Sequence, residues 1–335
     1  MDYRFAIIGC GNIGRRHAGH IAAHGVLDAV CDTVPERAQE LADLYGVRAY
    51  ASAAGLLKSV KPDIVSVCTP NGLHAGHAIM ALEAGSHVLC EKPMCISRES
   101  GLRMIAAAEK AGKRLFVVKQ NRYNPPVEAV KQLLDAGKLG AIHSFQVNCF
   151  WNRPLAYYKD SWHGTRDLDG GILYTQFSHF IDLLYWLLGD VAAVQGSRSN
   201  FTHGTSIAFE DTGVALLTMQ NGAIGTLQYT INSYQRNMEG SVTIFGEKGT
   251  VKIGGQYLNN IDFFSVEGET APTLPAGKPS NQYGFYEGSM SNHDRVYYHL
   301  IKALDNPGYR FVEAGEALKT VEIIEKIYAA SPLIP

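Results

Sequence analysis

Long hydrophobic runs are missing from this 335-residue sequence. No apolar stretch reaches the ~18 residues that a transmembrane helix needs, so the sequence predicts no contact with a membrane. An excess of one charge sign is also missing, because 30 Lys and Arg residues stand against 32 Asp and Glu residues. Proteins that bind polyanions carry a basic excess on at least one segment, and the sequence therefore argues against a nucleic-acid partner.

Cysteine is scarce, and all six residues lie within the first 149 positions (10, 31, 68, 90, 95 and 149). The spacing of Cys90 and Cys95 fits no common zinc pattern, and several of the others lie in apolar segments, where a free thiol packs as a small hydrophobic group. The N-terminus runs into an apolar segment without the pattern of a secretory signal. The sequence therefore predicts no metal site and a reducing, cytoplasmic location.

Short apolar segments alternate with helical segments over residues 1–120. Glycines are placed to end several helices, Pro35 to begin one, and Ser52 and Ser97 to cap two others. The predicted strands are residues 5–9, 27–31, 47–50, 63–67, 87–90 and 115–118. Short strands separated by helices of about ten residues pair in parallel with right-handed crossovers. We therefore predict an α/β domain with a doubly wound parallel sheet, which binds ligands at the carboxyl ends of its strands.

The pattern changes in residues 121–335, which we predict to form a second, α+β domain. Strand-like segments separated by turn signals predict a mostly antiparallel sheet, and helices are expected at 127–136, 173–188, 293–304 and 314–329. The predicted strands are residues 142–151, 191–197, 212–219, 223–231, 241–245 and 249–253. Residues 268–292, rich in Gly, Ser, Pro and Asn, are expected to form a long loop.

The strongest local motif is Gly9-Cys10-Gly11-Asn12-Ile13-Gly14, which follows a predicted strand and opens a predicted helix. Gly9 permits a tight turn, Gly11 lets the backbone approach a pyrophosphate, and Gly14 lets the helix pack closely on the strand. The helix N-terminus supplies free N–H groups for an anion. This context favours a dinucleotide site over an ordinary glycine turn.

Asp32 ends the second predicted strand and selects among dinucleotides. A carboxylate there accepts hydrogen bonds from the adenosine ribose hydroxyls and repels a 2′-phosphate, which favours NAD over NADP. Arg37 lies nearby in sequence but inside the second predicted helix. The alternative interpretation of Asp32 is a solvated turn residue.

Two further loops follow the fourth and fifth predicted strands. The first is Thr69-Pro70-Asn71-Gly72-Leu73-His74, which we expect to contact the dinucleotide unless His74 lies on a surface helix. The second is Glu91-Lys92-Pro93, where Lys92 is expected to point toward the bound ligand. Lysine in a partly desolvated site beside a cationic cofactor loses its proton more readily. A surface lysine is the alternative.

Together these motifs, with Asp169-Gly170-Gly171 and His179, resemble the glucose–fructose oxidoreductase/inositol dehydrogenase (Gfo/Idh/MocA) family over essentially the whole chain. The resemblance implies an N-terminal Rossmann domain, a C-terminal domain with an open-faced sheet, and NAD-dependent transfer of hydride to or from a sugar or polyol. It also implies that Lys92 and His179 are catalytic. Many members carry an aspartate four residues before the histidine, where this sequence has Thr175, and a direct Asp–His relay is therefore in doubt.

Within the family, three segments look like the UDP-N-acetyl-2-amino-2-deoxyglucuronate 3-dehydrogenases, which oxidise the C3′ hydroxyl of a UDP-sugar on the way to surface polysaccharides. These segments are residues 119–125, residues 150–165 and residues 236–241, and residues 291–294 are similar too. The pyrophosphate of such a substrate needs cations, and Arg122, Arg166 and Arg236 are candidates because a guanidinium pairs with phosphate in a bidentate way. Each is otherwise a solvated surface charge.

The predicted site is divided between cofactor and substrate. The cofactor-binding residues are Gly9, Gly11, Asn12, Ile13, Gly14, Asp32, Thr69, Pro70, Asn71, His74, Glu91, Lys92, Gln120 and Trp162. The substrate-binding residues are Lys92, Asn121, Arg122, Tyr157, Arg166, Thr175, His179, Arg236 and Asn237. His179 titrates near neutral pH and is the preferred base, with Lys92 orienting the hydroxyl. The reverse assignment stays open.

Two alternatives to a UDP-sugar dehydrogenase follow from the sequence. One is an NAD-dependent dehydrogenase of a free sugar or polyol such as inositol, and the other is a non-catalytic NAD-binding sensor. The alternating strands 212–219 and 223–231 leave one sheet face to be covered, which together with the resemblance predicts a homodimer or homotetramer through the C-terminal sheet. The exact sugar, the recycling of bound NADH by a 2-oxo acid, and the choice between dimer and tetramer are left open.

Overall fold

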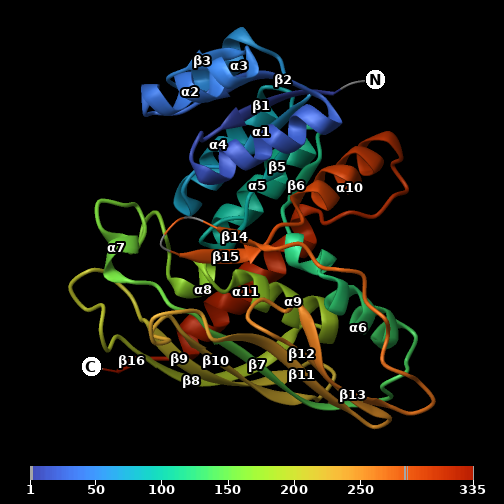
Figure 1. Ribbon diagram of the computed structural model, residues 1–335. Coiled ribbons are helices and arrows are strands. Elements are labelled where there is room, and N and C mark those ends of the chain that lie inside the picture. Colours follow the sequence, from blue (N-terminus) through green and yellow to red (C-terminus); the bar gives the residue numbers. More distant parts are fainter. Residues whose placement is uncertain (1–2, 283, 285, 335) are drawn as a thin grey trace. The chain divides into compact units, whose positions relative to one another are not determined.

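The computed structural model describes residues 3–282, 284 and 286–334 and divides into two compact units (Figure 1). The first unit comprises residues 3–119 and 293–321, and the second comprises residues 120–292 and 322–334. The chain thus leaves the first unit one residue before the predicted boundary. Residues 293–321, which the sequence pattern assigned to the second domain, return to the first unit.

The first unit is built on a parallel sheet with the strand order β3-β2-β1-β4-β5-β6. Its strands are β1 (Arg4–Ile8), β2 (Val26–Cys31), β3 (Arg48–Tyr50), β4 (Ile64–Val67), β5 (His87–Cys90) and β6 (Leu115–Val117). This is the order of a dinucleotide-binding doubly wound sheet, and the predicted fold class is confirmed. Since β2, β1, β4 and β5 are neighbours, the loops that begin at Gly9, Asp32, Thr69 and Glu91 leave the sheet at one edge.

The helices of this unit begin and end at the residues that the local signals indicate. They are α1 (Asn12–His24), α2 (Pro35–Tyr45), α3 (Ala53–Ser59), the 3-10 turn η1 (Asn71–Leu73), α4 (His74–Glu83), α5 (Arg98–Ala111), α10 (His293–Asp305) and the first half of α11 (Ala314–Ala330). Ser52 and Ser97 accept a hydrogen bond from the backbone N–H three residues on, and Gly46 and Gly112 end their helices with a positive φ. Short-range sequence signals therefore fix the boundaries of these elements.

The second unit contains an eight-stranded sheet with the order β13-β12-β11-β7-β10-β9-β8-β16. Its strands are β7 (Ile142–Phe150), β8 (Val191–Ser199), β9 (Thr212–Met219), β10 (Ile224–Thr230), β11 (Glu239–Gly246), β12 (Gly249–Gly254), β13 (Asn260–Val266) and β16 (Leu333–Ile334). The hairpins β9–β10 and β11–β12 are antiparallel, as the turn signals predicted, whereas β7 pairs with β10 in parallel. The sheet is mostly antiparallel, as expected.

Helices of the second unit lie over one face of this sheet (Figure 1). They are α8 (Ile172–Thr175), α9 (Ser178–Leu188) and the last turns of α11; α6 (Pro125–Asp135), α7 (Leu155–Tyr158) and the turn η2 (Gln120–Tyr123) complete the unit. The aromatic core beneath α9 includes Trp151, Phe177 and Phe180, whose rings contact one another. This core fixes α9, and with it the position of His179 in the second unit.

Several segments of the second unit differ from the sequence-based prediction, and strands β13 and β16 were not predicted. The single helix expected over 173–188 is interrupted, because α8 ends at Thr175 and α9 begins at Ser178. The loop expected over 268–292 contains a short hairpin of β14 (Ser280–Gln282) and β15 (Glu287–Met290). These two strands are only three and four residues long and largely polar, so they lack the apolar alternation from which a strand is predicted.

The opposite face of the large sheet carries exposed hydrophobic residues among polar ones such as Gln146, Gln228 and Lys252. Strand register places five large hydrophobic residues on this face, each between 41% and 54% exposed: Val214, Leu216, Ile224, Phe245 and Phe263. We call these residues the open face. Large hydrophobic residues gathered on one exposed face often mark an interaction site.

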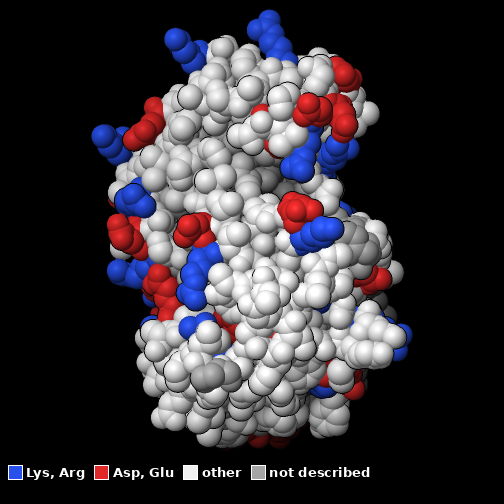
Figure 2. Space-filling view, turned by 90° about the vertical axis from the view of Figure 1, so that its left-hand side faces the viewer, with Lys and Arg blue, Asp and Glu red and all other residues white. Residues whose placement is uncertain are grey.

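Charge is mixed on the surface of the protein. On the face drawn in Figure 2, Lys and Arg side chains alternate with Asp and Glu side chains, so no field of one sign is present there. Among residues 3–282, 284 and 286–334, no helix combines the length and apolar character needed to cross a membrane. All six cysteines are buried and free.

Candidate active site

The glycine turn between β1 and α1 is shaped by steric constraints. Gly9 has a φ of +101°, and a Cβ atom there would lie 2.6 Å from the carbonyl oxygen of Cys68. A Cβ atom on Gly14 would lie 1.9 Å from the carbonyl oxygen of Gly9, whereas one on Gly11 meets nothing within 4 Å. The fold therefore requires Gly9 and Gly14, and the space above Gly11 is open to a ligand.

The N-terminus of α1 suits an anion. No side chain caps this helix, and Asn12, its first residue, is exposed, so the N–H groups of the first turn point toward the open space at Gly11. Backbone N–H groups at a helix N-terminus bind phosphate well. The turn thus fits the diphosphate of a dinucleotide, in agreement with the sequence-based prediction for residues 9–14.

The carboxylate of Asp32 holds the same turn in place. It accepts hydrogen bonds from the backbone N–H of Cys10 (2.7 Å) and of Val34 (2.9 Å). A carboxylate has about four acceptor sites, so the predicted contact with ribose hydroxyls is compatible with these two bonds and stays a prediction. Arg37 lies within α2 and is exposed, as the sequence indicated.

His74 connects the two loops that follow β4 and β5. Its Nδ1 lies 2.7 Å from the carbonyl oxygen of Pro93, and its Nε2 lies 2.7 Å from that of Thr69. Carbonyl oxygens only accept, so a neutral ring donates to one of them and a charged ring to both. Burial lowers the pKa of His74 and opposes the charged form. His74 therefore supports the loop that contains Lys92, and Asn71 is buried in the same turn. The contact of both residues with the cofactor stays a prediction.

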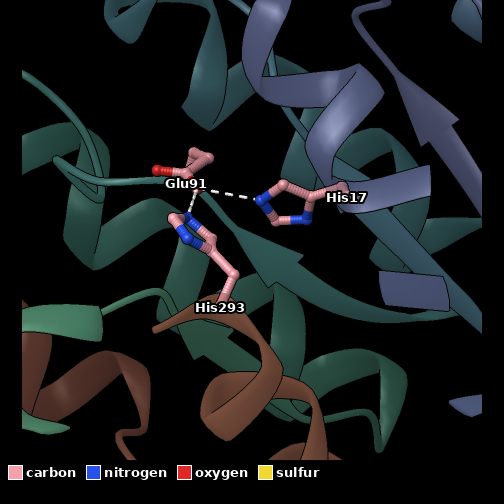
Figure 3. A group of neighbouring side chains, drawn as sticks. All are labelled: His17, Glu91 and His293. Carbon is pink, nitrogen blue, oxygen red and sulfur yellow. Dashed lines mark hydrogen bonds and ion pairs between the residues drawn. The ribbon is translucent and has the colours of Figure 1, made fainter. Parts of the chain in front are cut away.

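The side chain of Glu91 is hydrogen-bonded inside the first unit. It is 4% exposed, and one carboxylate oxygen accepts hydrogen bonds from His17 (2.9 Å) and His293 (3.1 Å) (Figure 3). Its other oxygen accepts the backbone N–H of Lys92 at 3.0 Å. The carboxylate of Glu91 therefore has an internal role, and the predicted contact of this residue with the cofactor stays a prediction. The side chain of Lys92 itself is half-buried.

His179 lies near the start of α9 in a polar environment of the second unit. Its Nε2 is 3.4 Å from the amide nitrogen of Gln120 and 3.3 Å from Oγ of Ser289, and these two groups are 3.1 Å apart. An amide nitrogen only donates, so Nε2 of His179 accepts and keeps a lone pair in this arrangement. A lone pair on Nε2 is what a general base needs.

Thr175 stands beside a buried carboxyl group. Its hydroxyl donates a hydrogen bond to Asp169, which also accepts the backbone N–H of Gly164 at 2.7 Å. Burial raises the pKa of Asp169 to about 7, against the opposing effect of these hydrogen bonds. The carboxyl group of Asp169 therefore lies beside Thr175, the position at which many family members carry an aspartate. Asp169 comes from the loop that precedes α8.

Two of the predicted substrate-binding residues are engaged inside the second unit. Arg122 forms a bidentate pair with Asp182, with both distances at 2.8 Å, and both side chains are buried. The amide oxygen of Asn237 accepts the backbone N–H of Asn152 at 2.8 Å, and its amide nitrogen donates to Tyr257 at 3.0 Å. Both residues stabilise the unit, and their contact with substrate stays a prediction.

The other predicted residues of this unit keep polar atoms that a ligand can use. Arg166 and Arg236 are exposed, and Trp162 stacks on His163 with ring centroids 3.9 Å apart. Tyr157 is buried, and its hydroxyl accepts a hydrogen bond from Gln176. The amide oxygens of Gln120 and Asn121 are buried without a hydrogen-bond partner among the described residues. A buried unsatisfied acceptor is costly, which indicates that a ligand or water binds there.

Several residues that take part in these hydrogen bonds were not predicted from the sequence. Ser289 lies in a strand that the pattern did not show, and the partners of Glu91 come from positions 17 and 293. His17 follows Gly14 by three residues, which places both on the buried face of α1, and this spacing was a usable signal. Residues 291–294, which include His293, belong to the resemblance, but no local signal connects His293 to Glu91 or Ser289 to His179, because each acts through a contact distant in sequence.

The glycine turn gives a matched pair of variants. Gly14→Ala is expected to lower the melting temperature of the unliganded protein by several degrees, because its Cβ atom clashes with backbone. Gly11→Ala is expected to leave that temperature unchanged and to weaken NAD binding at least tenfold, because its Cβ atom fills the ligand's space. Thermal unfolding and NAD titration separate the two effects. Equal NAD affinity of Gly11→Ala and the unaltered protein would contradict the proposed position of the diphosphate.

The raised pKa of Asp169 predicts a pH-dependent contribution to stability. Between the unfolded pKa of 3.8 and the folded pKa of about 7, the folded state binds the extra proton, so this contribution is complete at low pH and is lost as the pH rises to about 7. Urea unfolding measures the free energies of unfolding of the unaltered protein and of Asp169→Asn. The value for the unaltered protein, relative to that for Asp169→Asn, should fall by up to about 4 kcal/mol as the pH rises over that window. Asp167→Asn, at an exposed neighbour, is the control and should show no such trend.

Comparisons with known proteins agree with this geometry. Residues 3–119 match the family model described as "Oxidoreductase family, NAD-binding Rossmann fold", and residues 127–252 match the GFO/IDH/MocA C-terminal domain. These segments lie within the first and second compact units, respectively.

Three proteins illustrate the similarity. The WlbA dehydrogenase from Bordetella pertussis, solved with NADH and UDP-GlcNAcA, is 37% identical with a TM-score of 0.89, covering 98% of this chain and 96% of that one. The WlbA dehydrogenase from Chromobacterium violaceum, solved with the same ligands, is 35% identical with a TM-score of 0.88, covering 98% and 93%. The D-apiose dehydrogenase of Paraburkholderia graminis is 26% identical, covering 98% of this chain and 88% of that protein. The chain therefore belongs to the GFO/IDH/MocA oxidoreductases and is an NAD-dependent enzyme of that family.

Proposed function

We propose that this enzyme oxidises the C3′ hydroxyl of UDP-N-acetylglucosaminuronate to the 3-keto sugar, as a step toward a surface polysaccharide. The observation that supports this most strongly is the similarity to two dehydrogenases solved with UDP-GlcNAcA, at 37% and 35% identity and over nearly the entire chain. The segments at 119–125, 150–165 and 236–241 point to the same substrate class. The expected location is the cytoplasm.

The reaction needs a hydride acceptor, a base and a means of orienting the hydroxyl. Bound NAD supplies the acceptor. We propose that His179 removes the hydroxyl proton, since its Nε2 accepts hydrogen bonds in the second unit, and that Lys92 orients the hydroxyl and lowers its pKa. The reverse assignment of the two groups is the alternative, and the variants below distinguish the residues by their pH profiles.

The diphosphate of the substrate requires cationic partners. Arg166 and Arg236 are the candidates that the second unit leaves exposed, whereas the guanidinium of Arg122 is already paired with Asp182. A guanidinium binds phosphate in a bidentate way, and two such groups balance the charge of a diphosphate. The buried amide oxygen of Asn121 is a candidate acceptor for a sugar hydroxyl.

We also propose that the enzyme is a homodimer or homotetramer assembled through the open face. The five exposed hydrophobic residues lie on the same face of the sheet, on β9, β10, β11 and β13. A second copy of the same sheet covers such a surface with matched shape, which is the usual arrangement of symmetric oligomers. Size-exclusion chromatography with light scattering measures the assembly.

A second candidate function is oxidation of a free sugar or polyol. The curated relatives favour it, since they include D-apiose dehydrogenases and inositol 2-dehydrogenases at 25–30% identity. The presence of Thr175 in place of the family's aspartate argues against an inositol-like substrate.

The substrate test compares UDP-GlcNAcA with D-apiose and myo-inositol at equal concentration. The enzyme is mixed with NAD and with 2-oxoglutarate, so that any tightly held NADH is reoxidised. Mass spectrometry is expected to detect a UDP-sugar product lighter by two hydrogen atoms and no product from the other two compounds. Turnover of D-apiose or inositol with an inert UDP-sugar would establish the second candidate instead.

Replacement of Lys92 tests the catalytic assignment. Lys92→Ala is expected to lower kcat by about 10²–10⁴-fold, the range that removal of a group acting in proton transfer produces, with NAD affinity largely intact. Lys110→Ala, at an exposed lysine of α5, is the matched control and should retain full activity. Undiminished turnover by Lys92→Ala would overturn the assignment. If His179 is the base, the pH dependence of kcat should change in His179→Asn.

A further inference from the structure

Three polar side chains from distant parts of the sequence meet inside the first unit. His17 comes from α1, Glu91 follows β5, and His293 begins α10 (Figure 3). Their exposed fractions are 0%, 4% and 1%, so water does not satisfy their polar atoms. We call these residues the Glu91 triad.

The hydrogen bonds of the Glu91 triad assign a role to each atom. Both Nε2 atoms approach the same oxygen of Glu91, at 2.9 Å from His17 and 3.1 Å from His293. A carboxylate oxygen only accepts, so each ring carries its proton on Nε2. Nδ1 of His17 then accepts from the hydroxyl of Tyr297 at 2.7 Å, and that hydroxyl lies 3.0 Å from Ser66.

These bonds keep Glu91 ionised in a buried place. Burial alone would raise the pKa of the Glu91 carboxyl, but the hydrogen bonds from the two histidines lower it well below its ordinary value. Burial lowers the pKa of His293, which favours its neutral form. The other titratable groups beside the triad include Arg16, Cys68, His74, Cys90, Tyr297 and His20, whose ring stacks on that of His293. Burial raises the pKa of both thiols and of the phenol, so those three stay neutral near pH 7.

We propose that the Glu91 triad is a positioning element for Lys92, in which His17 and His293 orient the Glu91 carboxylate so that its second oxygen holds the backbone N–H of Lys92. That bond measures 3.0 Å. On the other side of Lys92, His74 contacts the carbonyl oxygen of Pro93 at 2.7 Å. The backbone around Lys92 is thereby fixed from both sides. This inference rests on the proposed catalytic function of Lys92.

The same three residue types also form divalent-metal sites, and their candidate ligand atoms lie within 4.8 Å of one another. The hydrogen-bond pattern favours the positioning role. Both Nε2 atoms donate to one oxygen, and the other oxygen is bound to the Lys92 amide, so the atoms that face one another are satisfied. Nδ1 of His293 is the buried atom of the triad that has no hydrogen-bond partner among the described residues. A metal would displace the two N–H protons.

Two variants of His293 test the positioning role. His293→Leu removes the N–H donor, whereas His293→Gln retains a donor in its amide group. We expect His293→Leu to lower kcat about tenfold or more, toward the ~10²-fold that a displacement of about 1 Å produces, with NAD affinity unchanged. His293→Gln should recover most of this loss. His24→Gln, on the same helix as His17 but outside the triad, is the control.

The pH profile separates positioning from a general loss of stability. Without the donor of His293, burial raises the pKa of Glu91, so kcat of His293→Leu should fall at acid pH and recover as the pH rises. The double variant Glu91→Gln/His293→Leu should lack this acid limb and be no slower than Glu91→Gln alone, because the two residues act as one unit. Additive losses with an unchanged profile would overturn the proposal.

A readout without substrate keeps this test independent of the proposed function. Hydrogen–deuterium exchange of the Lys92 amide should be at least tenfold faster in His293→Leu and near the original rate in His293→Gln. If Lys92→Ala retains turnover, the proposed function fails while the exchange result still decides the role of the triad. An unchanged exchange rate of the Lys92 amide in His293→Leu overturns the positioning role of the Glu91 triad and leaves the proposed function untouched. Stoichiometric metal in the purified protein, with activity lost on chelation and restored by Zn²⁺, would replace the proposal with a metal site.

Discussion

The close approach of α1 to the end of β1 is the constraint on which the first unit depends. A Cβ atom at Gly14 would lie 1.9 Å from the carbonyl oxygen of Gly9, so this packing exists only because position 14 is glycine. The approach sets the helix N-terminus over the turn, where its N–H groups suit a diphosphate. His17 lies three residues after Gly14 on the same face of α1, so its side chain points into the protein interior. One steric condition thus determines both the cofactor site and the partner of Glu91.

The second unit contains networks of polar side chains in a buried environment. His179, Gln120 and Ser289 satisfy one another, and Asp169 is satisfied by Thr175 and Gly164. Buried polar groups are costly unless they are hydrogen-bonded, so networks of this kind have few alternative arrangements. The acceptors left over, on Gln120 and Asn121, are therefore informative, because they mark where the protein alone does not complete its hydrogen bonds.

Residues whose role is local could be predicted from the sequence, and residues whose role depends on a distant partner could not. The spacing of Gly9, Gly11 and Gly14 and the caps at Ser52 and Ser97 act over a few positions, and they indicated the correct turn and helices. Arg122 looked like a phosphate ligand because its partner Asp182 lies 60 positions away. The same distance effect hid the two histidine partners of Glu91. For the polar hairpin at 280–290, hydrophobic alternation was absent altogether.

Thr175 stands where many family members carry an aspartate, and its neutral side chain fits the negative charge of the proposed substrate. A UDP-linked uronate carries a diphosphate and a carboxylate, and a second carboxylate one helical turn before His179 would repel it. Thr175 is neutral, and the nearby Asp169 has a pKa raised to about 7, so near neutral pH much of it is neutral as well. A free polyol has no charge to repel, and a carboxylate at this position would then cost nothing in substrate binding. The neutral Thr175 is therefore in keeping with the anionic sugar nucleotide that we propose as substrate.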